Sequence, residues 1–308
     1  MARRNLLYLG FEVFEIIIIV VISLAICITV CSIAMEAAVL FSPAFIFLFP
    51  VLITDFPTLT VNEAIGLAFI IELFGYSSSV TGYWKRRQID FNIVKQVLIV
   101  TIPAAIAFRF FSFAIDPQVL LTVFGVILLT LAALIFRSRN SLKQFSDAPQ
   151  SYRPRTCALC LMKDRDTELA KFTKIPMQSS DRGVLSSGGA FAGLIGIAIG
   201  EITNTYLLLR KRVPVKISTG TSAFILHLTI LSALIANFAV IGGLVPFLRV
   251  ESFQIPLNVA AIIAPTVVLG GQIGAYINSR LKHQTIVRIL MLVYTLVGVV
   301  ILTRISFG

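Results

Sequence analysis

Charged residues are scarce in this chain of 308 residues, because Asp, Glu, Lys and Arg together make up only 13% of it. Soluble domains carry roughly twice that share, so the composition excludes an ordinary soluble domain. Histidine contributes two residues and cysteine four. Two histidines are too few for a histidine-rich metal or haem site. The sequence therefore predicts no metal and no cofactor.

Sequence motifs of common enzymes are also lacking. The chain contains neither the phosphate-binding pattern G-x-x-x-x-G-K-[ST] nor the zinc-binding pattern H-E-x-x-H. Nothing in it forms a recognisable pair of nucleophile and base. These absences argue against nucleotide hydrolysis and predict that the chain is not an enzyme.

Apolar residues make up 57% of the chain, and the mean hydropathy is +0.93. Several apolar runs reach the ~20 residues that cross ~30 Å of hydrocarbon as a helix. These runs are 16–35, 37–53, 97–108, 117–136, 222–248, 257–277 and 289–303. The sequence predicts an all-α polytopic membrane protein whose partner is the lipid bilayer. The plasma membrane is the default location for a chain without an organelle address.

The net charge is +11, and the position of the basic residues explains it. They gather at the ends of apolar runs, as in "WKRRQ" (84–88), "RKRVPVK" (210–216) and "RLKH" (280–283), and in one polar segment, 137–183. This distribution is typical of the cytoplasmic side of membrane proteins. It therefore argues against nucleic acid as a partner.

The chain contains two halves with similar sequences. "AFIIEL" (68–73) matches "AFILHL" (223–228), and "SIAMEAA" (32–38) resembles "GIAIGEI" (196–202). A third pair, 116–135 and 282–302, follows in the same order. We therefore predict two membrane repeats, each a broken or re-entrant helix pair plus three transmembrane helices. Their bounds are 1–136 and 184–308, and the basic cytoplasmic linker 137–183 joins them.

The basic clusters predict how the second half begins. If 84–88 and 137–183 are cytoplasmic, "RKRVPVK" must be cytoplasmic too, so that 186–209 enters and leaves the membrane on one side. The arms of this segment would reach only about 18 and 12 Å at 1.5 Å per residue. The sequence therefore predicts a re-entrant hairpin with Glu201 near its tip.

Three further helices are expected after the hairpin, at 217–246, 255–278 and 284–304. Three crossings in each half is an odd number, so the repeats are expected to be inverted, as in many secondary transporters. The run at 13–35 is also long enough to cross the membrane by itself, and the orientation of the N-terminus, with Arg3 and Arg4, is left open.

The four cysteines form two pairs. Cys27 and Cys31 lie in the first apolar run and are interpreted as packing residues. Cys157 and Cys160 form "CALC" in the polar linker, where two further zinc ligands are lacking. They are interpreted as an incidental reduced pair, with redox sensing or a metal shared between subunits as alternatives.

Small polar residues cluster around the predicted hairpin and could contact a substrate. Short side chains there can donate hydrogen bonds to an anion, and irregular backbone at membrane depth is tolerated where it lines a cavity. The predicted substrate-binding residues are Ser42, Thr203, Asn204, Ser218, Thr219 and Thr221. The alternative is that these residues only allow close helix packing.

Ionisable residues within apolar runs are costly and are therefore functional candidates. Glu36 and Glu201 take similar places in the two halves, and so do Glu72 and His227. These four residues are predicted to couple transport to protons. The alternatives are hydrogen bonding at the helix breaks for Glu36 and Glu201 and a satisfied core histidine for His227. Arg109, near a helix end, is expected to snorkel towards the membrane surface, with a role as an anion ligand as the less favoured alternative.

The chain resembles the TauE/SafE (TSUP) sulfite exporter family over nearly its whole length. The resemblance rests on the glycine-rich break, the Ser/Thr-rich helix start, the connection "TGYWKRRQID" (81–90) and the doubled plan. It implies transport of sulfite, thiosulfate or related organic anions. The family pattern G-x-G-G-G-x-x-x-x-P is altered here to "AMEAAVLFSP" (34–43) and "AIGEITNTYL" (198–207). The glutamates in these two stretches are then either protonated when an anion binds, or the substrate is something else.

The leading hypothesis is a secondary transporter that exports a small sulfur-containing or organic anion by alternating access, with proton coupling. A cation carrier or channel, which binds its ion through Glu36 and Glu201, is the alternative. A membrane-embedded enzyme or scaffold ranks lower. The sequence leaves open whether the chain forms a homo-oligomer.

Overall fold

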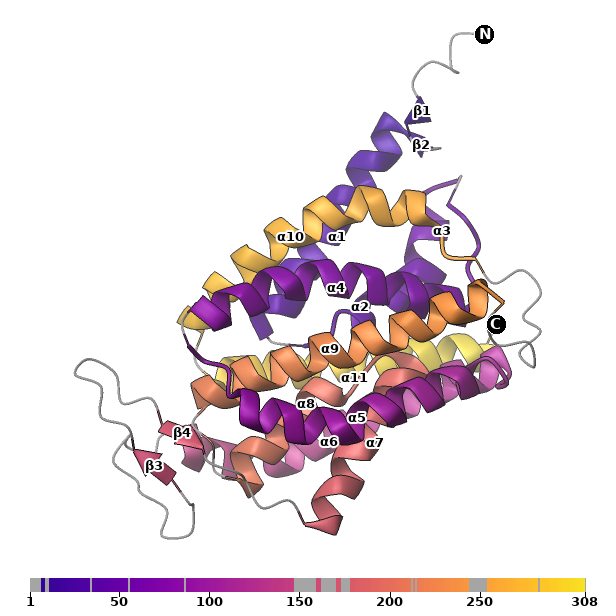
Figure 1. Ribbon diagram of the computed structural model, residues 1–308. Helices are drawn as coiled ribbons and strands as arrows, with labels where there is room; N and C mark the ends of the chain where they lie inside the picture. The colour runs from indigo at the N-terminus through magenta and orange to yellow at the C-terminus, as the bar shows by residue number, and fades with distance from the viewer. Residues whose placement is uncertain are drawn as a thin grey trace, which may run out of the picture.

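The computed structural model describes most of the chain (Figure 1). The described residues are 7–8, 11–33, 35–54, 56–85, 87–146, 159–161, 170–172, 178–211, 213, 215–243, 254–281 and 283–307. The helices of the first half are α1 (Val13–Ile33), α2 (Ala38–Pro43), η2 (Ala44–Leu48), α3 (Phe49–Leu52), α4 (Val61–Lys85), α5 (Phe91–Ser112) and α6 (Pro117–Ser146). Those of the second half are α7 (Ser179–Ile195), α8 (Ile199–Thr205), η3 (Tyr206–Arg210), α9 (Val215–Ile241), α10 (Leu257–Arg280) and α11 (His283–Phe307).

Short strands form two antiparallel pairs outside the helices. Strand β1 (Leu7–Tyr8) pairs with β2 (Phe11–Glu12) just before α1, and β3 (Leu159–Leu161) pairs with β4 (Ala170–Phe172) in the linker. Cys160 lies in β3, and Cys157 lies outside the described residues. The interpretation of this cysteine pair therefore stays a prediction.

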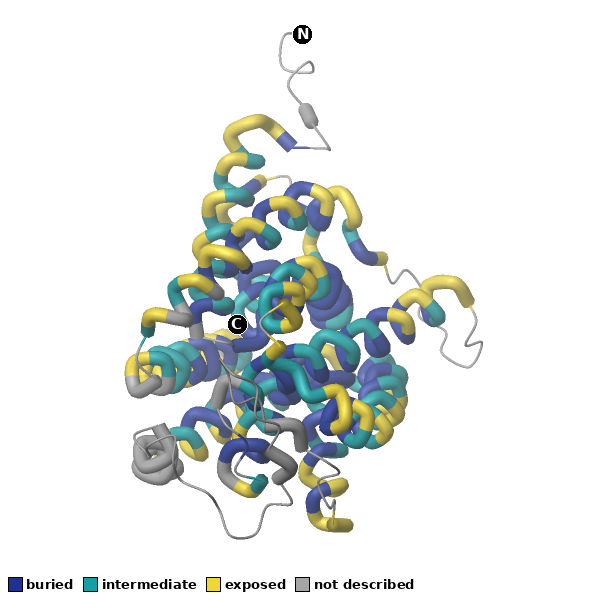
Figure 2. The backbone as a smooth tube through the Cα atoms, turned by 60° about the vertical axis from the view of Figure 1, so that its left-hand side comes forward, coloured by how far each residue is buried: buried dark blue, intermediate teal, exposed yellow. Residues whose placement is uncertain are grey.

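Within the described residues, seven helices are long and apolar enough to cross a membrane: α1, α4, α5, α6, α9, α10 and α11. Large apolar side chains are exposed on the outer faces of this bundle, among them Phe14, Ile99 and Leu134. Figure 2 shows exposed residues along the outer helices and buried ones inside. Because exposed apolar surface of this kind suits a lipid environment, the prediction of an all-α polytopic membrane protein is confirmed.

Helices α4 and α9 form the centre of the bundle and run antiparallel (Figure 1). Near the start of α4, Gly66 lies against Asn237 near the end of α9. At the other end, the backbone N–H of Asp90 donates to Thr221 Oγ1 at 3.0 Å. Thr221 belongs to the start of α9, so the two helices meet head to tail.

The remaining contacts between helices are related by an exchange of each helix for its counterpart in the other half. Helix α1 packs along α10 as α7 packs along α5, α2 packs on α4 as α8 packs on α9, and α6 packs on α11. When each helix is replaced by its counterpart in the other half, the first four pairs exchange with one another and the pair of α6 and α11 stays the same. The inverted repeat itself stays a prediction, and so does the division at 136 and 184, since α6 and α7 both extend into the predicted linker.

Glycines on α7 fix its distance from α5. A Cβ atom on Gly189 would lie 2.5 Å from the carbonyl oxygen of Thr101, and one on Gly193 would overlap the carbonyl oxygen of Ala105. Close backbone approach of this kind is common between membrane helices. It determines where α7 ends and therefore where the chain breaks in the second half.

The cysteines of α1 pack as expected. The thiol of Cys27 is buried and donates to the carbonyl oxygen of Val267 on α10 at 3.3 Å. A Cβ atom on Gly270 would lie 2.9 Å from the Cβ of Cys27. This agrees with the interpretation of Cys27 as a packing residue between α1 and α10.

Candidate functional site

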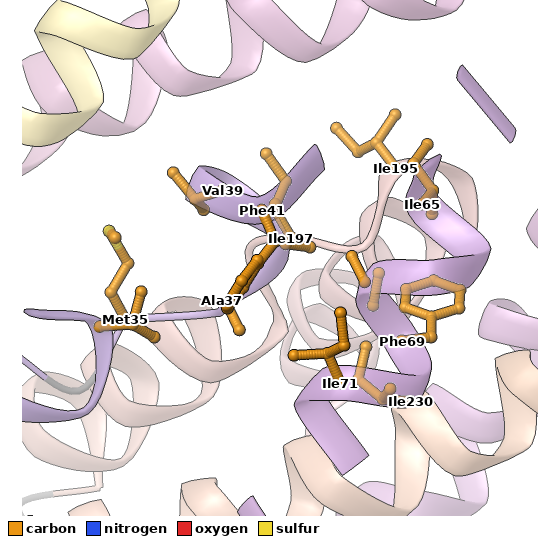
Figure 3. Close-up of a cluster of buried hydrophobic side chains, with 14 of the residues drawn as sticks. Met35, Ala37, Val39, Phe41, Ile65, Phe69, Ile71, Ile195, Ile197 and Ile230 are labelled. Carbon is orange, nitrogen blue, oxygen red and sulfur yellow. The ribbon is translucent and has the colours of Figure 1, made fainter. Parts of the chain in front are cut away.

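Two breaks in the helices lie side by side in the interior. The first includes residues 35–37, between α1 and α2, and the second covers 196–198, between α7 and α8. Figure 3 shows Ala37 of the first break and Ile197 of the second among the apolar side chains of α4. Backbone that is not helical at this depth is tolerated only inside protein, and the surrounding core supplies that environment.

The second break needs two residues in the left-handed region of backbone conformation. Gly196 has φ +77° and ends α7, and Ala198 has φ +81° and precedes α8. A Cβ atom on Gly196 would lie 2.7 Å from the ring of Phe69 and 3.1 Å from the Cβ of Ala38. Alanine at positive φ is uncommon and costs free energy. Such strain is a frequent property of functional sites, so the backbone geometry makes this break a candidate functional site.

The segment around this break is a hairpin that returns to the side from which it came. Asp181 at the start of α7 binds Arg210 Nε at 2.9 Å and Lys211 Nζ at 2.8 Å, both at the end of η3. Burial raises the pKa of the Asp181 carboxyl, but hydrogen bonds from Lys211 and the Gln178 backbone and the two positive charges outweigh this effect. The pKa therefore lies below its usual value. Ion pairs therefore join the two arms of the hairpin at its open end, which we call its mouth.

Three carboxyl groups gather at the two breaks, as the positions of Glu36 and Glu201 in the repeats suggested. Glu36 and Glu72 are each 1% exposed, and Glu201 is partly buried. The backbone N–H of Gly200 donates to Glu36 Oε1 at 2.5 Å. The backbone N–H of Ala37 donates to Glu72 Oε1 at 3.1 Å. A carboxyl from one element therefore satisfies the start of the helix that follows each break.

Two tyrosines complete this group, and neither was predicted from the sequence. The hydroxyl of Tyr294 on α11 donates to Glu201 Oε1. The hydroxyl of Tyr76 donates to the carbonyl oxygen of Met35 in the first break at 2.8 Å. Tyr76 follows Glu72 by four residues, so the helical period could have placed it on the same face. No local signal identifies Tyr294, which lies 93 positions from its partner.

The second oxygen of each carboxyl has no hydrogen-bond partner. This holds for Glu36, Glu72 and Glu201, whose Oε2 atoms are all buried. The ion pairs found among the described residues involve Asp181 and none of these three. Three buried negative charges without a cation would repel one another and lose their hydration. The group therefore favours states in which protons neutralise part of its charge.

The predicted polar residues fall into two groups. Ser218 Oγ donates to Asn204 Oδ1 at 2.6 Å, which brings the start of α9 to the end of α8. The hydroxyl oxygen of Thr221 accepts from the backbone N–H of Asp90, and Thr219, two residues earlier in α9, is half-buried. Ser42 on α2 and Thr203 on α8 are buried, and their hydroxyls have no partner. These last two belong to the short helices that follow the two breaks.

His227 lies on α9, one residue after Leu226, whose side chain contacts Gly200 at the second break. Its Nδ1 atom is buried and has no hydrogen-bond partner. No hydrogen bond between the described residues joins it to Glu72. Glu72 accepts from the backbone N–H of Ala37 at the first break, and the coupling role of His227 stays a prediction.

The expectation that Arg109 snorkels to the surface is wrong. Its side chain is completely buried near the end of α5. Its guanidinium donates to Asn62 on α4 and to Asn237 on α9. The polar side chains of two neighbouring helices hold it in the interior, and they lie 47 and 128 positions away in the sequence.

Comparison with known proteins finds one family model and a distant relative. The family model of the sulfite exporter TauE/SafE matches residues 18–301. The probable membrane transporter protein YunE of Bacillus subtilis (strain 168) is 23% identical over 243 residues, which cover 79% of this chain and 81% of that protein. No solved structure matches. The family match begins within α1 and ends within α11, so it contains both breaks and all three carboxyl groups.

Proposed function

The chain belongs to the TauE/SafE family of sulfite exporters, and from this premise we propose that it is a secondary transporter of a small anion coupled to protons. The proposed substrate is sulfite or a related sulfur-containing or organic anion. One observation carries the proposal: Glu36, Glu72 and Glu201 meet at the two breaks without a cation partner among the described residues. Buried acids in such surroundings are suited to take up and release protons.

Proton uptake would also let an anion approach. An anion and three ionised carboxylates repel each other, and the low dielectric of the interior strengthens that repulsion. Once protons neutralise the group, a carboxyl can donate a hydrogen bond instead of only accepting one. In the proposed cycle, the anion therefore binds the protonated form, and return of the empty site follows proton release.

The hydroxyls of Ser42 and Thr203, on the short helices that follow the two breaks, are the proposed first contacts of the substrate. Both are buried and lack a partner, and they lie on α2 and α8. The backbone N–H groups of Ala37 and Gly200 at the same breaks are already satisfied by Glu72 and Glu36. We therefore assign the anion to the free hydroxyls, with Asn204, Ser218, Thr219 and Thr221 further along the same path.

Glu36 would link proton uptake to movement. Its carboxyl belongs to the first break, and it accepts a hydrogen bond from Gly200 in the second. A charged acceptor makes a stronger hydrogen bond than a neutral one. Protonation of Glu36 would weaken this link between the two halves, which is the step that alternating access between them requires.

The alternative is a cation carrier, because three unpartnered carboxyl oxygens could also bind a cation directly. Flux measurements with the purified full chain in proteoliposomes separate the two. Labelled sulfite or thiosulfate is supplied with and without a pH gradient, and the wild type is compared with Glu201→Gln. Glu12→Gln, which removes an exposed carboxyl, is the matched control.

Saturable anion flux that responds to the gradient, with the response lost only in Glu201→Gln, would support the proposal. Absence of anion flux together with a cation current that the same substitution removes would refute it in favour of the carrier.

A further inference from the structure

Arg109 is a fully buried positive charge whose partners among the described residues are neutral. Its Nη2 donates to the carbonyl oxygen of Asn62 at 3.0 Å, and its Nη1 donates to Ser112 Oγ at 3.2 Å. Its Nε donates to Asn237 Oδ1. The guanidinium also lies over the rings of Phe69 and Phe113, at 5.3 and 4.8 Å from their centroids.

No carboxylate among the described residues neutralises this charge. Glu63 is the acid nearest to Asn62 in the sequence, but it accepts from Thr60 and from the backbone N–H of Gln254. The ion pairs between described residues belong to Asp181 at the mouth of the hairpin. Neutral acceptors and aromatic rings compensate only part of the cost of a buried charge. An ionisable residue in this position is a candidate for function.

A second donor without an acceptor lies in the same cluster. Asn237 is 0% exposed, and its Oδ1 is used by Arg109, while its Nδ2 has no hydrogen-bond partner. The Nδ2 atom lies beside Gly66, 3.2 Å from where a Cβ would be. A buried cluster of positive charge and N–H donors suits an anion, because an anion supplies acceptors.

We propose that Arg109 and Asn237 form an anion-binding site at the end of the bundle where α4 begins and α9 ends. The ligand class is a small oxyanion of the sulfite or sulfate type, because a planar guanidinium can bind two of its oxygens at once. The inference rests on the proposed function in taking this anion to be the cargo. The site lies at the opposite end from Lys85 and Arg280, which end α4 and α10 in the basic clusters.

Phe69 separates this site from the second break. One of its faces lies against Arg109, and its edge meets the position of Gly196. The side chain projects from α4 among the core residues around the breaks (Figure 3). An anion that moves between Arg109 and the carboxyl group must therefore displace one aromatic ring. Since Arg109 is completely buried here, access from solvent requires the ends of α4, α5 and α9 to separate.

The substitution Asn237→Asp distinguishes an anion-binding site from a purely structural contact between helices. The substitution keeps the size of the side chain and places a carboxylate where Nε of Arg109 already donates. An internal partner would stabilise the buried charge and would also occupy the donors that an anion needs. If Arg109 and Asn237 only hold the helices together, the substitution would strengthen that contact, and anion binding and flux would stay the same.

Two measurements on the purified full chain test the proposal. The first is the shift of melting temperature on addition of sulfite or sulfate, with chloride at equal ionic strength as reference. We expect a shift of a few degrees for the wild type at saturating anion. Asn237→Asp is expected to melt at a higher temperature without anion and to lose the anion-induced shift. Asn92→Asp, an exposed position on the same helix as Arg109, makes the same change of charge and should keep the shift.

The second measurement is anion flux in proteoliposomes, which should fall about tenfold or more in Asn237→Asp. Arg109→Lys should retain part of both signals, because it keeps the charge but loses the planar fork. An unchanged anion-induced shift and unchanged flux in Asn237→Asp would overturn the site while leaving the proposed function intact. The wild type could instead show the anion-induced shift without any anion flux, and Asn237→Asp could remove that shift. This result would contradict the proposed function and support the site.

Discussion

The two breaks have the same place in the two halves but are held by different forces. In the second half, Asp181 joins the two arms of the hairpin at its mouth through Arg210 and Lys211. In the first half, the chain after the break is held by stacked phenylalanines of α2, η2 and α3, among them Phe45 and Phe49, whose ring centroids are 5.6 Å apart. The segment around the second break is therefore closed by ion pairs, and the segment after the first break is held by apolar packing.

The helices before the breaks differ as well. Helix α1 is long and apolar enough to cross a membrane, and α7 is not among the helices with that property. Polar residues such as Asp181 and Ser180 begin α7, whereas the sequence of α1 is almost uniformly apolar. We therefore expect the stability contributed by Asp181 in the second half to respond to salt and pH, and the stability contributed by the phenylalanine stack in the first half to be insensitive to both.

Phe45→Ala should give the largest loss of stability. Phe45 is completely buried and stacks on Phe41 and Phe49. Removal of a buried aromatic ring costs about 3–5 kcal/mol. The loss should be the same at low and high salt. Thermal melting of the purified chain measures it, with Val51→Ala as the control because Val51 is 76% exposed. An equally large loss in the control would show that the stack is not what holds this segment.

Asp181→Asn should give the next largest effect and should depend on pH. Breaking the buried side of this ion pair is expected to cost about 2–3 kcal/mol near neutral pH, less than a fully buried pair because Arg210 is partly exposed. The folded pKa of Asp181 lies below its usual value. Its contribution is therefore present above the unfolded pKa, ~3.9, and is lost as the pH falls through the folded value.

Melting curves of the wild type and Asp181→Asn between neutral and acidic pH check this prediction. The difference between the two proteins should shrink as the pH falls. A difference that stays constant with pH would mean that the carboxyl acts through packing and not through charge.

Gly193→Ala should have a smaller effect on stability. It tests the close packing of α7 on α5 separately from the ion pairs of Asp181. The added methyl group meets the backbone of α5 at Ala105, and overpacking of this kind costs about 1–3 kcal/mol. Gly183→Ala on the same helix, where nothing lies within 4 Å, should be neutral or slightly stabilising. Melting temperatures of both variants decide the matter, and equal effects would contradict the close contact between α7 and α5.

The sequence predicted the apolar helices and the hairpin well because both depend on local properties. Long apolar runs must become helices in a membrane, and basic residues on both sides of 186–209 required the chain to turn back. The same patterns placed Glu36 and Glu201 at the breaks, where the structure also has them.

Arg109 and Tyr294 could not be interpreted in the same way. An arginine near a helix end has the same local sequence whether it snorkels or is buried. Its environment is set by Asn237, 128 positions away. His227 and Glu72 match in the repeats, yet only Glu72 joins the carboxyl group at the breaks through the N–H of Ala37. Contacts between the two halves decide these cases, and no single segment of sequence contains them.

Proton movement driven by an anion tests the central claim most directly. Proteoliposomes with a pH-sensitive dye inside receive a gradient of thiosulfate, which stays fully ionised near neutral pH and carries no protons itself. The account predicts that wild-type protein moves protons together with thiosulfate, and that Glu201→Gln moves thiosulfate without the pH change. Thiosulfate movement without any change of internal pH in the wild type would contradict the assignment of Glu36, Glu72 and Glu201 to proton coupling.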